Sequence, residues 1–261
     1  MIIREVQCKS VLTKSNLPEV EYCINPYIGC THNCVYCYAS FMKRFTGHAE
    51  EEWGNFLDIR VNSVEVLKKQ ITSKRKRGDI LIGSVTDSYQ PIENKYHLTR
   101  QILEVLAGKG FPVSILTKSD LVVEDVDVIK SVESCEVGLT ITSLSDSVSR
   151  IFEPGASLPF KRINALKVLK ENGIRTYAFI GPMLPGITQI EEIVKALKGK
   201  VDFVMFETLN LNKANRERTL KAFLKAGVAF PSNSINWAEV EKKARRICGE
   251  YGIPVKGFYK H

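Results

Sequence analysis

Short runs of apolar and β-branched residues alternate along the chain with segments whose apolar residues recur at helical spacing. Val64, Leu67 and Ile71 show the second pattern, which places apolar side chains on one face of a helix. The short runs are typical of strands buried in a sheet. They predict six strands, at residues 22–25, 79–83, 112–117, 136–142, 175–181 and 201–206.

Regular alternation of strand and helix favours a parallel sheet with right-handed crossovers. Six such units predict an α/β fold, a partial (β/α)6 TIM-like barrel. The length of 261 residues suits one domain, with a core at about 20–210 and a C-terminal helical extension at about 211–261.

Three helix starts carry a capping-box pattern, in which a polar residue precedes a Glu by three positions. These pairs are Asn62 with Glu65, Thr188 with Glu191, and Asn236 with Glu239.

Composition and charge narrow the classes of protein only moderately. The chain has 37 Lys and Arg against 29 Asp and Glu, a formal net charge of +8. This balance is compatible with an anionic partner, although many cytosolic proteins share it. The amino terminus lacks the apolar run of a signal peptide, and no segment is long enough to span a bilayer, so we expect a cytoplasmic protein without a membrane partner.

Two basic tracts have different expected positions. Residues 74–77 precede the second predicted strand, so they belong at the amino-terminal face of the barrel and favour a solvated surface. Residues 212–218 follow the sixth strand and emerge at the carboxyl-terminal face, where barrels of this type build active sites. Lys213, Arg216 and Arg218 are candidates for phosphate contacts there, with a solvated helix start as the alternative.

Three of the seven cysteines lie within eight positions, directly after the first predicted strand. Cys30, Cys34 and Cys37 have C-x3-C-x2-C spacing, which allows three thiolates to ligate three irons of a cubane cluster and leaves the fourth iron without a protein ligand. An odd number of clustered cysteines argues against a disulfide framework. A structural zinc site with His32 or Cys23 as the fourth ligand is the alternative.

The cysteine loop within this α/β pattern resembles the radical S-adenosylmethionine (SAM) superfamily. Further segments are similar to its spore photoproduct lyase-like group, often labelled DNA repair photolyases. These segments are Asn25-Pro26-Tyr27, Gly83-Ser84-Val85-Thr86-Asp87-Ser88-Tyr89-Gln90-Pro91, Leu98-Thr99-Arg100, Thr117-Lys118-Ser119 and Glu153-Pro154-Gly155.

The resemblance implies an enzyme whose [4Fe-4S] cluster cleaves SAM reductively to a 5′-deoxyadenosyl radical, which abstracts hydrogen from an organic substrate. The electron would come from a one-electron reductant of flavodoxin or ferredoxin type. The resemblance further implies residues that contact SAM, and it implies that two tyrosines beside the cluster relay hydrogen atoms. The implied residues are Ser84 and Asp87 for the ammonium group, Lys118 for the carboxylate, Ser143 for the ribose or carboxylate, and Tyr36 and Tyr38 beside the cluster.

The substrate expected from the resemblance is a nucleic-acid lesion or a nucleotide-like molecule. One departure argues against repair of the spore lesion itself, because Ser84 stands where the spore lyase has a hydrogen-donating cysteine, and a Ser O–H bond is too strong for that step. Two further hypotheses remain open at this point. One is a radical SAM enzyme acting on a peptide or small metabolite, and the other is a zinc-stabilised nucleic-acid-binding module.

Overall fold

The computed structural model describes residues 1–18, 20–72, 76–231 and 235–261. Its main sheet has eight strands in the order β11-β10-β9-β8-β7-β6-β3-β2. Their bounds are β2 Leu12–Lys14, β3 Tyr22–Ile24, β6 Ile80–Ile82, β7 Val113–Thr117, β8 Cys135–Thr140, β9 Arg175–Met183, β10 Phe203–Thr208 and β11 Val255–Tyr259. The six strands from β3 to β10 match the six predicted strands to within two residues at each end, and they pair in parallel in chain order. The predicted partial (β/α)6 barrel is confirmed.

Two strands at the sheet edges extend this barrel. β2 pairs antiparallel with β3, and β11 pairs in parallel with β10. The segment at 211–261 was expected to be a helical extension, which is wrong in part, because the chain returns to the sheet as β11. A second sheet, absent from the prediction, has the order β1-β5-β4. Its strands are β1 Ile2–Val6, β4 Tyr27–Ile28 and β5 Phe56–Arg60, and β4 leads directly into the cysteine segment.

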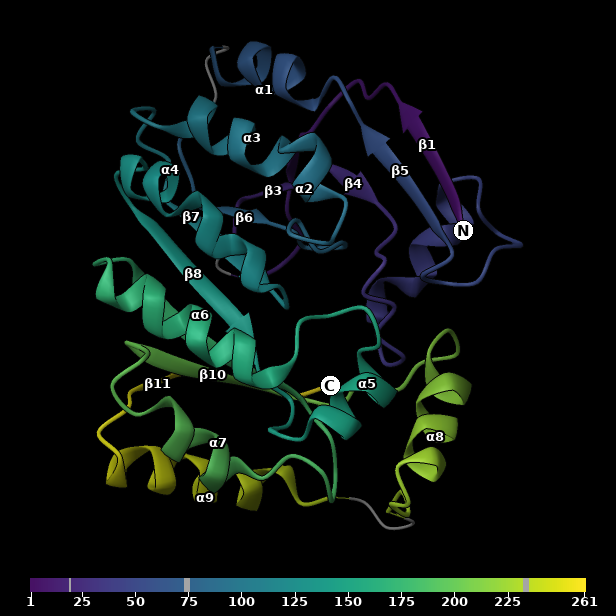
Figure 1. Cartoon of the computed structure of the whole chain (residues 1–261), viewed down its shortest axis with the longest axis vertical. Helices are drawn as coiled ribbons and strands as arrows, with labels where there is room; N and C mark the ends of the chain where they lie inside the picture. The colour runs from purple at the N-terminus through teal and green to yellow at the C-terminus, as the bar shows by residue number, and fades with distance from the viewer. Residues whose placement is uncertain (19, 73–75, 232–234) are drawn as a thin grey trace.

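The helices divide into an outer layer and a group near the barrel mouth (Figure 1). The outer layer contains α1 Ser63–Thr72, α3 Leu98–Leu106, α4 Val126–Ser131, α6 Pro159–Glu171, α7 Ile190–Leu197 and α9 Trp237–Glu250. The remaining helices are η1 Tyr38–Phe45, α2 Glu93–Tyr96, η2 Asp120–Asp125, α5 Asp146–Phe152 and α8 Arg216–Lys225. α5 packs against α8. None of the helices among the described residues is long and apolar enough to cross a membrane.

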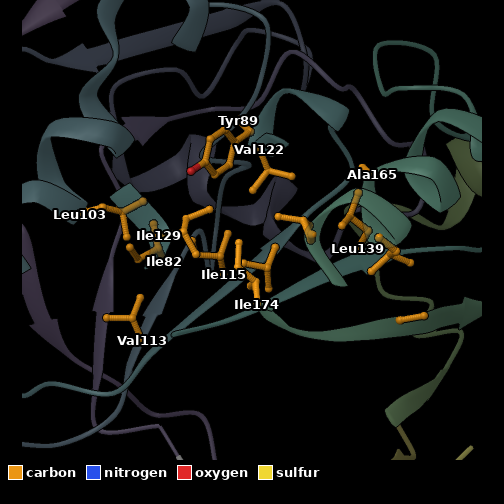
Figure 2. Close-up of a cluster of buried hydrophobic side chains, with 14 of the residues drawn as sticks. Ile82, Tyr89, Leu103, Val113, Ile115, Val122, Ile129, Leu139, Ala165 and Ile174 are labelled. Carbon is orange, nitrogen blue, oxygen red and sulfur yellow. The ribbon is translucent and has the colours of Figure 1, made fainter. Parts of the chain in front are cut away.

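The main hydrophobic core lies between the sheet and the outer helices (Figure 2). Alternate residues of the strands, such as Ile115 and Leu139, point outward into this core, as the period of two in a strand requires. The intervening residues line the inside of the barrel. There the Tyr177 ring covers Gly138, where an added Cβ would lie 2.2 Å from that ring, and it stacks on Phe203 with centroids 5.0 Å apart. Aromatic rings therefore fill part of the barrel interior.

Only one of the three predicted capping residues caps its helix. The Asn236 side chain accepts a hydrogen bond from the backbone three residues later, at 3.2 Å. The Asn62 side chain instead pairs with the backbone N–H and carbonyl of Cys8, at 2.8 and 2.9 Å. The Thr188 hydroxyl donates to the carbonyl of Thr142 at 2.8 Å. Long-range partners outcompete the local cap at both sites.

Candidate active site

The three clustered cysteines share one loop that follows β4. Cys30 and Cys34 are buried, Cys37 is half-buried, and all three thiols are free. The N–H of Asn33 donates to the Cys30 carbonyl and the N–H of Cys37 to the Cys34 carbonyl, both at 3.2 Å. Two tight turns therefore fold the loop, and burial, Asp87 and the neighbouring Cys34 and Cys37 together raise the pKa of Cys30.

Two glycines allow neighbouring segments to approach this loop closely. Gly29 has a φ of +87°, and a Cβ there would lie 2.4 Å from the carbonyl oxygen of Phe56. At Gly155, a Cβ would lie 2.2 Å from the carbonyl oxygen of Thr31. Both distances are shorter than any side chain tolerates, so glycine is required at each position.

The segment that follows β6 holds the first half of the loop. Gln90 Oε1 accepts hydrogen bonds from the backbone N–H of Thr31 at 2.9 Å and from its hydroxyl at 3.2 Å. Gln90 Nε2 donates to the hydroxyl of Thr86 at 3.1 Å, and this hydroxyl donates to the carbonyl of Gly29. These side chains fix the backbone on both sides of Cys30.

Helix α8 holds the second half of the loop. Asn215 Nδ2 donates to the Tyr36 carbonyl at 2.9 Å, and the Thr219 hydroxyl donates to the Val35 carbonyl at 3.3 Å. Arg218 Nη2 donates to the Asn33 carbonyl at 3.3 Å and also contacts the Asn33 side chain. The expected phosphate contact of Arg218 is therefore replaced by a contact to the cysteine loop. Lys213 and Arg216 remain exposed.

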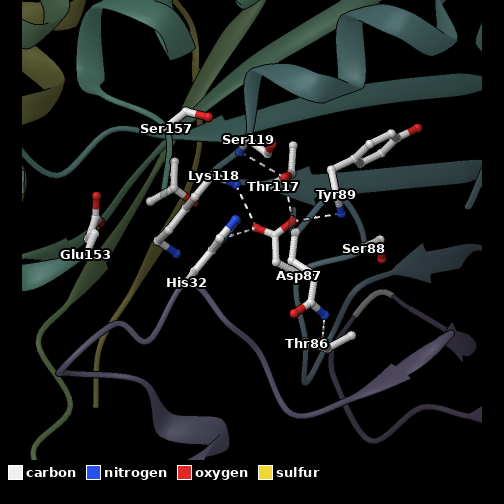
Figure 3. A network of polar contacts seen from close by, with 12 residues as sticks. His32, Thr86, Asp87, Ser88, Tyr89, Thr117, Lys118, Ser119, Glu153 and Ser157 are labelled. Atoms are coloured by element: carbon white, nitrogen blue, oxygen red, sulfur yellow. Dashed lines mark hydrogen bonds and ion pairs between the residues drawn. The ribbon is translucent and has the colours of Figure 1, made fainter. Parts of the chain in front are cut away.

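Asp87 lies at the centre of a buried polar network beside the loop (Figure 3). One carboxylate oxygen accepts from the Thr117 hydroxyl at 2.6 Å and from the Tyr89 N–H at 3.0 Å. The other accepts from the Lys118 N–H at 2.8 Å and lies 3.2 Å from Nδ1 of His32. Burial alone would raise the pKa of Asp87, but His32 and these hydrogen bonds outweigh it and hold the pKa well below its usual range.

These contacts change the expected role of Asp87. Both of its oxygens are engaged by protein donors, which join the ends of β6 and β7 to the cysteine loop. A carboxylate that is satisfied in this way has little capacity left for the ammonium group of SAM. We therefore assign Asp87 a structural role in place of the expected cofactor contact.

A second buried network surrounds Glu153, at the end of α5. Its carboxylate accepts hydrogen bonds from the Tyr36 hydroxyl and from Thr142 Oγ1, the latter at 3.0 Å, and it forms an ion pair with Arg162. Burial would raise the pKa of Glu153, but the positive charges of Arg162 and Lys118 outweigh it and lower the pKa. The Tyr36 side chain is therefore anchored by an ionised carboxylate.

The other expected SAM contacts lie at the ends of successive strands. The Tyr38 hydroxyl donates to the carbonyl of Ser84, whose hydroxyl accepts from the Asn25 amide at 3.0 Å. Ser143 is buried after β8 and accepts from the Ser145 N–H at 3.1 Å. The Lys118 ammonium lies 5.7 Å from the centre of the Tyr36 ring. Burial would lower the pKa of Lys118, but Cys34 and Glu153 outweigh it and raise the pKa.

The surroundings of the three thiols fit an anionic iron–sulfur cluster. Among the described residues, five buried side-chain atoms lack a hydrogen-bond partner, and three of these belong to Ser40, Trp53 and Arg218. Trp53 packs in one apolar cluster with Cys30, Ser40 lies in the turn after Cys37, and the Arg218 charge acts on Cys37 and Cys34. Unpaired donors around three thiols suit a group that brings its own sulfur acceptors.

The same region offers less to a single zinc ion. In the part of the chain that the structure describes, no group of three His, Cys, Asp or Glu side chains converges in a way that would hold one metal ion. A cubane cluster does not need such convergence, because each thiolate binds a different iron. His32, one of the two candidates for a fourth zinc ligand beside Cys23, directs Nδ1 to Asp87.

Comparison with known proteins identifies the class of enzyme. The model of the radical SAM superfamily matches residues 24–199. An uncharacterised protein of Methanocaldococcus jannaschii is 41% identical over 215 residues, which cover 82% of this chain and 80% of that protein. The chain therefore belongs to the radical SAM superfamily, whose members use SAM and a [4Fe-4S] cluster. This membership replaces the hypothesis of a zinc-stabilised binding module.

One further relative and one solved structure of similar fold have informative names. A Pseudomonas phage M6 protein, named a radical SAM Nalpha-GlyT isomerase, is 26% identical over 169 residues, which cover 64% of this chain and 34% of that protein. The fold matches that of spore photoproduct lyase. A double mutant of that enzyme with bound AdoMet and dinucleoside spore photoproduct has a TM-score of 0.70 at 16% identity, and the match covers 99% of this chain and 80% of that chain.

Sequence reasoning missed several side chains that position the loop. Gln90, Glu153 and Gly155 lie within segments that carry the family resemblance. The resemblance marks these segments, but it does not indicate what the three residues do. Asn215 and Thr219 carried no signal, because their partners lie about 180 positions earlier in the chain.

The first basic tract, at residues 74–77, follows the expected placement where it is described. Lys76 and Arg77 are exposed before β6, at the end remote from the cysteines, and Lys74 and Arg75 lie outside the described residues.

Proposed function

We propose that this enzyme holds a [4Fe-4S] cluster on Cys30, Cys34 and Cys37, binds SAM at the open iron, and abstracts hydrogen from a nucleic-acid lesion or a nucleotide-like substrate. The observation that carries the proposal is the array of three free thiols at the barrel mouth, surrounded by unpaired buried donors. When bound, the reduced cluster supplies the electron that cleaves SAM to methionine and a 5′-deoxyadenosyl radical.

The chain's own residues bind and orient these groups in the proposed site. Lys118 remains protonated because Cys34 and Glu153 raise its pKa, which makes it a suitable partner for the SAM carboxylate. Tyr36 and Tyr38 lie on either side of Cys37, with Tyr36 fixed by Glu153 and Tyr38 partly exposed at the mouth. We propose that the hydroxyls of Ser84 and Ser143 contribute further polar contacts to SAM.

The substrate class is supported by one relative and by one solved structure of similar fold rather than by a contact in the site. Structures of spore photoproduct lyase share the fold and contain a dinucleoside lesion, and the phage relative is named a GlyT isomerase. Lys213 and Arg216 are exposed at the start of α8, close in sequence to the residues that clasp the cysteine loop. This position suits contacts from Lys213 and Arg216 to substrate phosphates.

Anaerobic reconstitution with iron and sulfide tests the cofactor part of the proposal. We expect about four irons and four sulfides per chain, and production of 5′-deoxyadenosine from SAM once dithionite is added. Cys34→Ser should lose both the cluster and the production of 5′-deoxyadenosine. Cys135→Ser should retain the cluster and this activity, because Cys135 lies at the start of β8, away from the barrel mouth. A wild-type protein that takes up no iron and sulfide would contradict the proposal.

Deuterated substrates test the substrate class. Deuterium should pass from a labelled dinucleotide into deoxyadenosine, and Arg216→Ala should weaken DNA binding and reduce its salt slope by about 1. Label transfer from a peptide or small metabolite alone would favour the other radical SAM hypothesis. DNA binding that does not respond to salt would exclude the phosphate contacts.

A further inference from the structure

Arg218 differs from the other side chains that hold the cysteine loop, because it carries charge as well as hydrogen bonds. Asn215 and Thr219 each donate to one backbone carbonyl between Cys34 and Cys37. Arg218 donates through Nη2 to Asn33, immediately before Cys34. One face of α8 thus reaches the loop at three points, and only one of these contacts brings a positive charge.

The guanidinium of Arg218 has unused capacity at this position. Its Nη1 atom is buried and has no hydrogen-bond partner among the described residues. None of the ion pairs in the described part of the chain includes Arg218, in contrast to Arg162, which pairs with Glu153. Burial lowers the pKa of Arg218, and the nearby Cys37 and Cys34 thiols oppose this shift. A buried, unpaired N–H on a side chain that already contacts the cysteine loop needs an acceptor.

We propose that Arg218 donates a hydrogen bond through Nη1 to a sulfur of the bound cluster and raises the reduction potential of that cluster. The inference rests on the proposed function, since it requires the cluster on Cys30, Cys34 and Cys37. Reduction adds one negative charge to the cluster, and a nearby positive charge stabilises the reduced form more than the oxidised form. Hydrogen bonds to cluster sulfurs act in the same direction.

A purely structural role for Arg218 predicts a different result. If Arg218 only fixed Asn33, loosening the loop in another way would have the same effect as removing the charge. Asn215→Ala removes a neutral hydrogen bond to the same loop, and Lys225→Gln removes an exposed charge from the same helix. Arg218→Gln removes the charge and keeps an amide donor, whereas Arg218→Lys keeps the charge and loses the planar fork.

The test is a redox titration of each reconstituted protein without SAM, monitored by electron paramagnetic resonance, after iron and sulfide contents have been matched. At a fixed potential, Arg218→Gln should lower the ratio of reduced to oxidised cluster by about tenfold, which corresponds to about 59 mV for one electron. Arg218→Lys should lower the ratio by a smaller factor, roughly threefold, because it keeps the charge. Lys225→Gln should leave the ratio unchanged, and Asn215→Ala should change it by a clearly smaller factor than Arg218→Gln does.

Three results would overturn the inference. An unchanged ratio in Arg218→Gln would show that its charge does not act on the cluster, and an equal change in Asn215→Ala would indicate a purely structural role. If Arg218→Gln did not retain the cluster, Arg218→Lys would serve in its place. An unchanged ratio of reduced to oxidised cluster in Arg218→Lys would then exclude the hydrogen bond from Nη1. A wild-type protein that takes up no cluster would instead refute the proposed function itself. These outcomes keep the two proposals distinguishable.

Discussion

Substitution of Glu153 by glutamine removes the negative charge from the buried network behind the cysteine loop while preserving the size of the side chain. Glu153 and Arg162 have side chains that are 0% and 1% exposed. In the variant, the guanidinium of Arg162 keeps its hydrogen bonds to the backbone carbonyls of Ser157 and Thr140. It loses the carboxylate with which it is paired. The change therefore tests how far one ionic contact stabilises this fold.

The expected cost follows from the burial of the pair. Removal of one partner from a buried ion pair leaves an uncompensated charge and costs about 3–5 kcal/mol. The hydrogen bond from Tyr36 also changes from a charged to a neutral acceptor, a smaller loss of about 1 kcal/mol. Against a native stability of about 5–15 kcal/mol, the effect is large. For a chain of this size, the combined loss corresponds to a fall in Tm of roughly 8–24 °C.

Urea and thermal unfolding of the apo-protein, followed by circular dichroism under anaerobic reducing conditions, measure this cost. Glu217→Gln is the matched control, because Glu217 pairs with Lys221 on α8 with side chains that are 80% and 73% exposed. An exposed pair of this kind contributes little to the free energy of unfolding, because water and salt screen the two charges. The wild type should also lose the Glu153 contribution as the pH falls below about 4.3, the usual glutamate pKa, towards the lowered pKa of the folded state.

A loss of stability below about 1 kcal/mol in Glu153→Gln would refute this reasoning, because the buried charge of Arg162 would then have found compensation elsewhere. The same conclusion would follow if Glu217→Gln were as destabilising as Glu153→Gln. Substitution of both members of the pair by methionine provides a second check. The double variant should be more stable than Glu153→Gln, because it removes the unpaired charge.

Two further predictions concern the other buried contacts. Asp87→Asn should cost about 2–4 kcal/mol, because its donors lose a charged acceptor, and it should flatten the pH dependence below about 3.9, where the depressed pKa of Asp87 makes the wild type lose stability. Denaturant unfolding from pH 2 to 7 measures both effects, and equal slopes for the two proteins would be contrary to this expectation. Gly138→Ala should cost about 1–3 kcal/mol because its methyl group overlaps the Tyr177 ring. In contrast, Gly249 lies in α9, and a methyl group added there meets no other atom within 4 Å. Gly249→Ala should therefore stabilise the protein by about 0.5–1 kcal/mol in the same assay, because alanine favours a helix. Equal stabilities for the two alanine variants would disprove the packing argument.

The sequence determined the elements that depend on local patterns. The six central strands follow from short apolar runs, and their parallel order follows from the helices between them. The spacing of Cys30, Cys34 and Cys37 likewise indicated the cluster chemistry, because all three ligands lie on one loop. In contrast, β1, β4 and β5 gave little signal. β4 has two residues, and these strands become a sheet only by pairing with one another.

Only the tertiary structure decided how the site is held. The contact between Arg218 and Asn33 joins residues 185 positions apart, and the Asn215 contact to Tyr36 spans 179 positions. Spacing along the sequence carries no information about such pairs. The same limit applies to Asp87, for which the family resemblance implied a contact to SAM before its four protein donors were visible. A polar side chain takes its role from the partners that folding places beside it, and those partners come from several strand ends at once.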